Sequence, residues 1–142
     1  ITPATLAAPG TMPDYELRYW SLCTGAAPSR GAAYDCVFDE QVALRDRRYT
    51  IVVSRPADRP QNAREECGVT WLDFGAGEGI EGPHGPGRST VGVVYMRFMA
   101  PEPDWAHAPH RVARPGEERA IMGAAFPWSA YTSREAFEAR AC

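Results

Sequence analysis

The sequence predicts a mainly β protein, an antiparallel β-sandwich or jelly-roll-like fold with short helices near the C-terminus. Short runs that alternate in polarity or are rich in β-branched and aromatic residues recur through the first two thirds, separated by Gly, Pro and Asp turns. Helix signals are confined to the last third. At 142 residues, with 44% apolar and 23% charged residues, the chain is expected to form one domain. We place that domain at residues 14–142, after a Pro-rich extended segment or linker at residues 1–13.

The predicted strands follow in order along the chain. Residues 15–23 alternate, which places Leu17 and Tyr19 on one face and Trp20 on the other. Further strands are predicted at residues 34–39, continued past a bend by 41–44, and then at 49–55, 68–74 and 90–99. The last of these is apolar on both faces, so we expect it at the centre of a sheet.

The last third predicts coil and short helices. Residues 100–118 are punctuated by Pro and are expected to hold one helical turn, and residues 117–125 predict a short helix. Residues 132–142 predict a better one, with Thr132 and Glu135 as a capping box and with Phe137 and Ala141 on one face.

Four scattered cysteines indicate whether the protein resides in an oxidising or a reducing compartment. None belongs to a Cys-x-x-Cys pair, and four cysteines allow three pairings. Cys23 and Cys36 flank a hairpin-like connection, which favours a Cys23–Cys36 bridge and leaves Cys67 to pair with Cys142. The alternative is four free thiols in a reducing compartment. Two bridges predict an exported protein, located outside the cell or in the cell envelope.

Composition also limits the partners. All 15 basic residues are Arg, and the net charge is −3, which argues against a nucleic-acid partner. No segment is apolar over the roughly 18 residues that a membrane-spanning helix needs, so the protein is not expected to span a membrane.

Several motifs resemble an uncharacterised family of mostly exported bacterial proteins with a C-terminal β-sandwich domain of unknown function. That family's pattern runs Tyr-Trp-Ser-Leu, Asn-Trp-Leu-Pro and Arg-x-Tyr-x-Pro. Tyr19 to Leu22 match its first element, Trp71 and Leu72 match part of the second, and Arg97 and Pro101 match the last. Thr70, Asp73 and Met99 depart from it. The resemblance implies export and a β-sandwich, and it implies no chemistry.

The Gly-rich stretch 75–87, which contains His84, has two interpretations. A phosphate-binding loop would need a helix after it and a Gly-Lys-Ser/Thr motif, and this sequence has neither. We therefore predict a long connection between strands, whose tip can carry a binding site.

Two further groups are candidate sites. Asp104, His107 and His110 could together hold a divalent ion, and solvated or packed histidines are the alternative. Trp105 and Trp128 lie in irregular segments, where they either pack against the sandwich or join His84 in a binding rim.

No residue pattern indicates a nucleophile or a cofactor. There is no Gly-x-Ser-x-Gly elbow, and the cysteines are assigned to bridges. We expect an exported, non-catalytic module without a cofactor, which binds a protein or glycan partner or forms part of a cell-envelope or extracellular assembly. The alternative is a small metal-dependent or hydrolytic enzyme that uses Asp104, His107 and His110.

Overall fold

The computed structural model describes residues 16–25, 33–46, 48–75 and 92–142. The predicted linker at residues 1–13 and most of the Gly-rich stretch, including His84, lie outside them. The described residues divide into two compact units, one formed by residues 16–20 with 98–131 and the other by the described parts of residues 21–97 with 132–142. The single domain expected at residues 14–142 stays a prediction.

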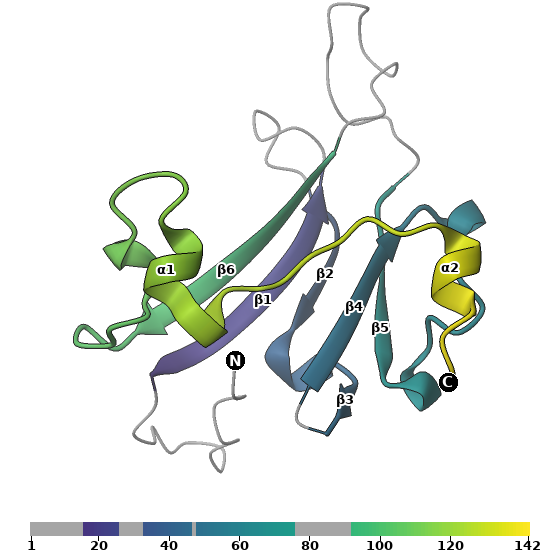
Figure 1. Ribbon diagram of the computed structural model, residues 1–142, viewed down its shortest axis with the longest axis horizontal. Coiled ribbons are helices and arrows are strands. Elements are labelled where there is room, and N and C mark those ends of the chain that lie inside the picture. The colour runs from purple at the N-terminus through teal and green to yellow at the C-terminus, as the bar shows by residue number, and fades with distance from the viewer. Residues whose placement is uncertain (1–15, 26–32, 47, 76–91) are drawn as a thin grey trace, which may run out of the picture. The chain divides into compact units, whose positions relative to one another are not determined.

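The described residues form two three-stranded sheets and a few short helices (Figure 1). The mainly β prediction is therefore confirmed. One sheet has the order β2-β1-β6, formed by β2 (Ala33–Phe38), β1 (Leu17–Gly25) and β6 (Val93–Pro101). The other has the order β3-β4-β5, formed by β3 (Leu44–Arg45), β4 (Arg48–Ser54) and β5 (Val69–Asp73).

Of the three strand pairs whose direction is described, one is not antiparallel. The β1–β2 and β3–β4 pairs are antiparallel, but β4 and β5 run parallel, with Val52 opposite Trp71. A parallel pair needs a crossover of roughly a dozen residues or more. Residues 55–68 provide it, and they contain the short 3-10 helices η2 (Pro56–Asp58) and η3 (Glu65–Cys67).

The centre of the first sheet is β1, not the strand predicted at residues 90–99. Trp20 is 2% exposed and Thr24 is 0% exposed, and Leu17 is also buried, so both faces of β1 are covered. The Thr24 hydroxyl donates to the Asp73 carbonyl of β5. By contrast, β6 ends the order of described strands and exposes Val94 and Met99.

The prediction of a strand at residues 41–44 is wrong for all of these residues except Leu44. Residues Asp39–Gln41 form the 3-10 helix η1, and β3 has only two residues. The cause is local, because the Gln41 side-chain oxygen accepts the Phe38 backbone N–H at 3.3 Å, so the side chain competes with a strand ladder.

Both predicted disulfides are confirmed. Cys23 bonds to Cys36, directly opposite it in the β1–β2 register, and Cys67 bonds to Cys142. Two disulfides fit an extracellular or otherwise oxidising compartment. Within the described ranges, no helix is long and apolar enough to cross a membrane.

The core of the larger unit gathers around the C-terminal helix α2 (Arg134–Glu138). Phe137 packs with Ala63, Cys67 and Val69, and Trp71 covers this cluster while remaining partly exposed. The Trp71 indole N–H donates to Ser54 Oγ at 2.9 Å, and the Arg59 guanidinium lies 4.5 Å from the ring centroid. Trp71 thus lies at the edge of the core, and its side chain is less buried than those of its neighbours Val69 and Leu72 in the strand.

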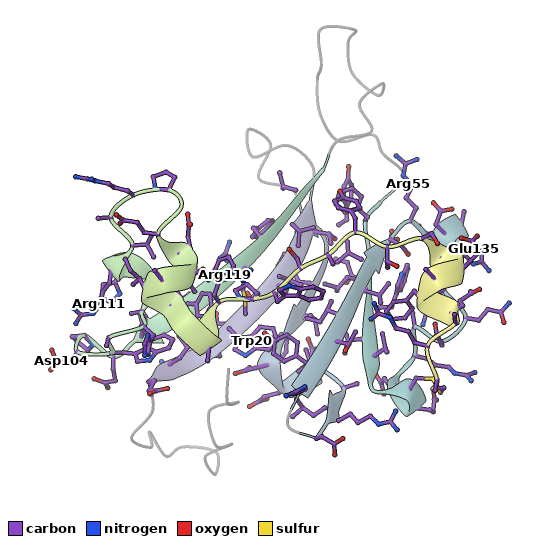
Figure 2. All side chains as sticks on the ribbon, viewed as in Figure 1. Trp20, Arg55, Asp104, Arg111, Arg119 and Glu135 are labelled. Carbon is purple, nitrogen blue, oxygen red and sulfur yellow. A yellow bond between two sulfur atoms is a disulfide. The ribbon has the colours of Figure 1, made fainter. Side chains whose placement is uncertain are left out.

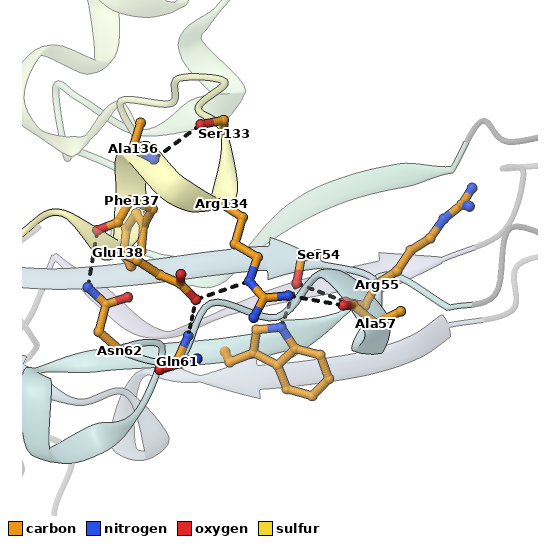
Figure 3. Close-up of polar contacts among 11 residues, drawn as sticks. Ser54, Arg55, Ala57, Gln61, Asn62, Ser133, Arg134, Ala136, Phe137 and Glu138 are labelled. Carbon is orange, nitrogen blue, oxygen red and sulfur yellow. Dashed lines mark hydrogen bonds and ion pairs between the residues drawn. The ribbon is translucent and has the colours of Figure 1, made fainter.

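Polar contacts dock α2 onto the crossover (Figure 3). The Gln61 backbone N–H donates to Glu138 Oε1 at 2.7 Å, and Arg134 Nε donates to the same oxygen at 3.0 Å. These two donors, the backbone one first, lower the pKa of the Glu138 carboxyl. The helix begins one residue later than predicted, since Ser133 Oγ, and not Thr132, accepts the Ala136 N–H at 3.1 Å.

The smaller unit holds the 3-10 helix η4 (Pro109–Arg111), α1 (Glu118–Met122) and η5 (Gly123–Ala125). These elements confirm the single turn and the short helix predicted there. Trp105, Ala108, Met122 and Ala125 are buried in this part of the chain. Arg111 donates to the carbonyl oxygens of Trp105 and Pro103 at 2.9 and 2.7 Å, which fixes the coil before η4 (Figure 2).

Candidate functional site

The predicted metal group does not assemble. Throughout the ranges that the structure describes, no three His, Cys, Asp or Glu side chains are grouped to hold a metal ion. Asp104 is exposed (Figure 2), and His110 lies exposed in η4. His107 Nδ1 lies 2.7 Å from the Ile121 carbonyl oxygen, which gives this ring a structural partner. Asp104, His107 and His110 are therefore surface or turn residues here.

Of the predicted binding rim, the structure describes Trp105 and Trp128. Trp105 is only 9% exposed, because its own turn and the Arg111 contacts hold it inside the smaller unit. This burial is the packing alternative, so Trp105 does not belong to an open rim. Trp128 is 73% exposed, and Tyr131 nearby is fully exposed. His84, the third predicted member, lies outside the described residues.

A different candidate site lies in the larger unit. A pocket of about 290 Å³ lies between the β3–β4 hairpin, the end of the crossover and the residues after α2. Its charged lining consists of Arg45, Asp46, Arg48 and Arg140, and Thr50 and the core residues Val69 and Phe137 also border it. We call it the arginine pocket.

The hairpin presents two of the arginines side by side. Arg45 and Arg48 are directly opposite each other in the β3–β4 register, and Asp46 makes the turn with a φ of 52°. Residues directly opposite on paired strands share a face, and like charges at such positions destabilise the pair. A local arrangement that costs stability is a signal of a binding role.

Close packing fixes the stem of Arg45. Gly68 ends η3 in the left-handed conformation with a φ of 69°, which glycine adopts without steric cost. A Cβ at Gly68 would lie 2.9 Å from the Arg45 Cβ. The glycine therefore gives Arg45 room to lie against the end of the crossover.

The third arginine is held from the other side. The Arg140 guanidinium lies 5.0 Å from the centroid of the Phe137 ring, whose side chain is anchored in the core. Asn62 Nδ2 donates to the carbonyl oxygens of Phe137 and Arg140 at 3.1 and 3.2 Å, and the Cys67–Cys142 bridge follows two residues on. This wall of the pocket is thus covalently and non-covalently fastened to the crossover.

The charges of the arginine pocket are not balanced within the protein. None of its three guanidinium groups forms an ion pair with a carboxylate in the described parts of the chain, where the ion pairs are Arg64–Glu66 and Arg134–Glu138. Three Arg and one Asp leave a formal local charge of 3 − 1 = +2, although the whole chain carries −3. Such a site attracts an oxyanion, for which guanidinium groups are suited by their planar, paired N–H donors.

A second hollow, of about 360 Å³, lies beside Trp71 and has a different character. Its two Arg and two Glu cancel, and its donors are already used. Arg59 stacks on Trp71 and donates to the Ala63 carbonyl at 2.8 Å, while Arg64 pairs with Glu66 at 4.0 Å. This hollow therefore carries no net charge, and both of its arginines already have partners within the protein.

Sequence reasoning missed the arginine pocket. The run from Arg45 to Arg48 reads as a charged turn, and Arg140 is far from it in sequence. Long-range contacts bring the two segments together, namely the parallel β4–β5 pairing, the Cys67–Cys142 disulfide and the packing and hydrogen bonds of the C-terminal segment.

Compared with protein-family models, curated proteins and solved structures, the chain shows no significant match to any of them.

Proposed function

We propose that this protein is an exported, non-catalytic module that binds a protein or glycan partner at the arginine pocket, alone or as part of a cell-envelope or extracellular assembly. The observation that carries the proposal is the set of three arginines around one hollow without carboxylate partners in the described residues. Binding an acidic group there would relieve the repulsion between Arg45 and Arg48.

The remaining expectations belong to the same proposal. The two disulfides fit an oxidising compartment, and export follows from them as an inference. The Thr24–Asp73 hydrogen bond between the two sheets supports a sandwich-like packing of the larger unit. The resemblance to the uncharacterised exported bacterial family agrees with both. The enzyme alternative depended on Asp104, His107 and His110, and no contact among these residues favours it.

The test is a binding screen with a pocket variant. The oxidised protein would be applied to arrays of acidic, neutral and basic glycans and peptides, beside the Arg45→Gln/Arg48→Gln double variant. Arg114→Gln is the matched control, because Arg114 is exposed and is not among the residues that line the pocket. The proposal predicts ligands that the native chain and the control bind and that the double variant loses. Ligands retained by all three proteins, or none at all, would refute it.

A further inference from the structure

We propose that the ligand of the arginine pocket is an acidic sugar, namely the carboxylate-bearing uronic acid unit of an anionic polysaccharide. This inference rests on the proposed function and adds the chemical class of its ligand. Three properties of the pocket favour such a ligand: its size, its positive charge and the Asp46 carboxylate in its lining.

The size suits one ring and not a large ligand. Clefts that enclose drug-sized molecules typically measure about 300–1,000 Å³. At about 290 Å³, the arginine pocket is at the lower end, and it borders solvent at the exposed Arg45, Asp46 and Arg48. One sugar unit can occupy it while its neighbours in the polymer extend into solvent.

The arginines select an anion. A carboxylate can accept two N–H bonds from one guanidinium, and charge-assisted bonds of this kind are roughly twice as strong as neutral ones. The Arg140 guanidinium lies over the Phe137 ring, and the aliphatic stem of Arg45 lies close to Gly68. Because the Arg140 donor is already positioned, binding there costs less side-chain entropy than at a free surface arginine.

Asp46 distinguishes an acidic sugar from a simple anion. This carboxylate lines the same pocket and forms no hydrogen bond or ion pair with a described residue. An inorganic polyphosphate carries no hydroxyl groups, so it would offer Asp46 no proton donor. A uronic acid carries hydroxyl groups beside its carboxylate, so it can donate to Asp46 and exchange hydrogen bonds with Thr50 while its acid group meets the arginines.

The experiment measures affinity for polymers that differ only in charge. Isothermal titration of the oxidised protein would use polygalacturonate, alginate and hyaluronan, each beside its methyl-esterified, neutral form. We expect at least one acid form to bind and its ester to bind about tenfold more weakly or worse, since losing a charge-assisted contact costs about that much. Arg48→Gln should weaken binding of the acid form by a similar factor, and Arg114→Gln should leave it unchanged.

The Asp46→Asn variant separates the ligand classes. If Asp46 accepts sugar hydroxyls, the change weakens binding of the uronate polymer, whereas a plain anion site would bind more tightly once a negative charge is removed. Tighter binding of the uronate by Asp46→Asn would overturn the inference, as would inorganic polyphosphate binding more tightly than every uronate.

Failure of this inference is distinguishable from failure of the proposed function. If no uronate binds but the array screen finds another ligand that requires Arg45 and Arg48, the ligand class is wrong and the binding function stands. If no ligand depends on these arginines, both are wrong. Folding of each variant is checked by far-UV circular dichroism, so that loss of binding is not loss of structure.

Discussion

The two disulfides should contribute unequally to stability, and the structure allows the difference to be isolated. Cys23 and Cys36 are 13 residues apart, whereas Cys67 and Cys142 are 75 apart. In the chain-entropy model, these loops correspond to about 3 and about 4.5 kcal/mol, a difference of about 1.5 kcal/mol in the free energy of unfolding. The two loops do not overlap along the chain, so the two contributions are independent in this model.

The two disulfides are packed to a similar degree, so the stabilities of variants that lack one or the other can be compared directly. In each bridge one cysteine is buried, Cys23 at 5% and Cys67 at 6% exposed, and its partner is exposed. Replacing both cysteines of a pair by Ala therefore removes a similar amount of buried sulfur in the two variants. The difference between the variants should report mainly the size of the closed loop.

The measurement is urea unfolding of the native protein and of the two double-alanine variants, followed by tryptophan fluorescence without reductant. We expect the Cys67→Ala/Cys142→Ala variant to be the less stable of the two by about 1.5 kcal/mol. Equal stabilities, or a larger loss in the Cys23→Ala/Cys36→Ala variant, would refute the loop-length reasoning. Unfolding in a single transition by both fluorescence and circular dichroism would further support the predicted single domain.

Three further predictions concern the C-terminal helix and the pocket. Phe137→Ala should lower the free energy of unfolding by about 3–5 kcal/mol, because its ring fills the core cluster, whereas Trp128→Ala should change it by less than about 0.5 kcal/mol; equal losses in urea unfolding would contradict this assignment. The pKa of the Glu138 carboxyl is lowered from its ordinary value of 4.5, so its carboxylate stabilises the folded state at pH values above 4.5. This contribution is lost as the pH falls through the lower pKa of the folded state. Glu138→Gln should therefore be less stable than the native chain at pH 7 and converge with it in acid, and a gap that persists unchanged at low pH would be contrary evidence. Gly68→Ala should lower the free energy of unfolding by about 1–2 kcal/mol, because its backbone is left-handed and the added Cβ would clash with Arg45. Gly116→Ala, with a φ of 96° and no neighbour within 4 Å, should show the backbone cost alone. A loss at Gly68 no larger than the loss at Gly116 in thermal unfolding would show that Arg45 moves aside.

The sequence was most informative where a local pattern has a single structural solution. The β-branched run at residues 49–55 and the alternation over residues 15–23 predict strands, and β4 and β1 overlap these ranges. The cysteines flanking a short connection predict a Cys23–Cys36 bridge, because the ends of such a connection return to each other. Short-range signals also located the last helix and missed its first residue by one, since Thr132 and Ser133 are both acceptable caps.

Only the tertiary structure decided which strands are neighbours and which charges meet. Local sequence specifies that residues 68–74 form a strand, but the path of the crossover decides that β5 pairs with β4 in parallel. An apolar run such as residues 90–99 predicts a central strand whether or not other strands flank it on both sides. Nothing in the local sequence indicates that this strand lies at the end of the described sheet. The arginine pocket combines residues nearly a hundred positions apart, and the charge of Arg45, Arg48 and Arg140 looks like ordinary surface charge in the sequence. Their meeting depends on long-range pairing, on a disulfide and on one close glycine contact, and none of these is encoded within a single segment.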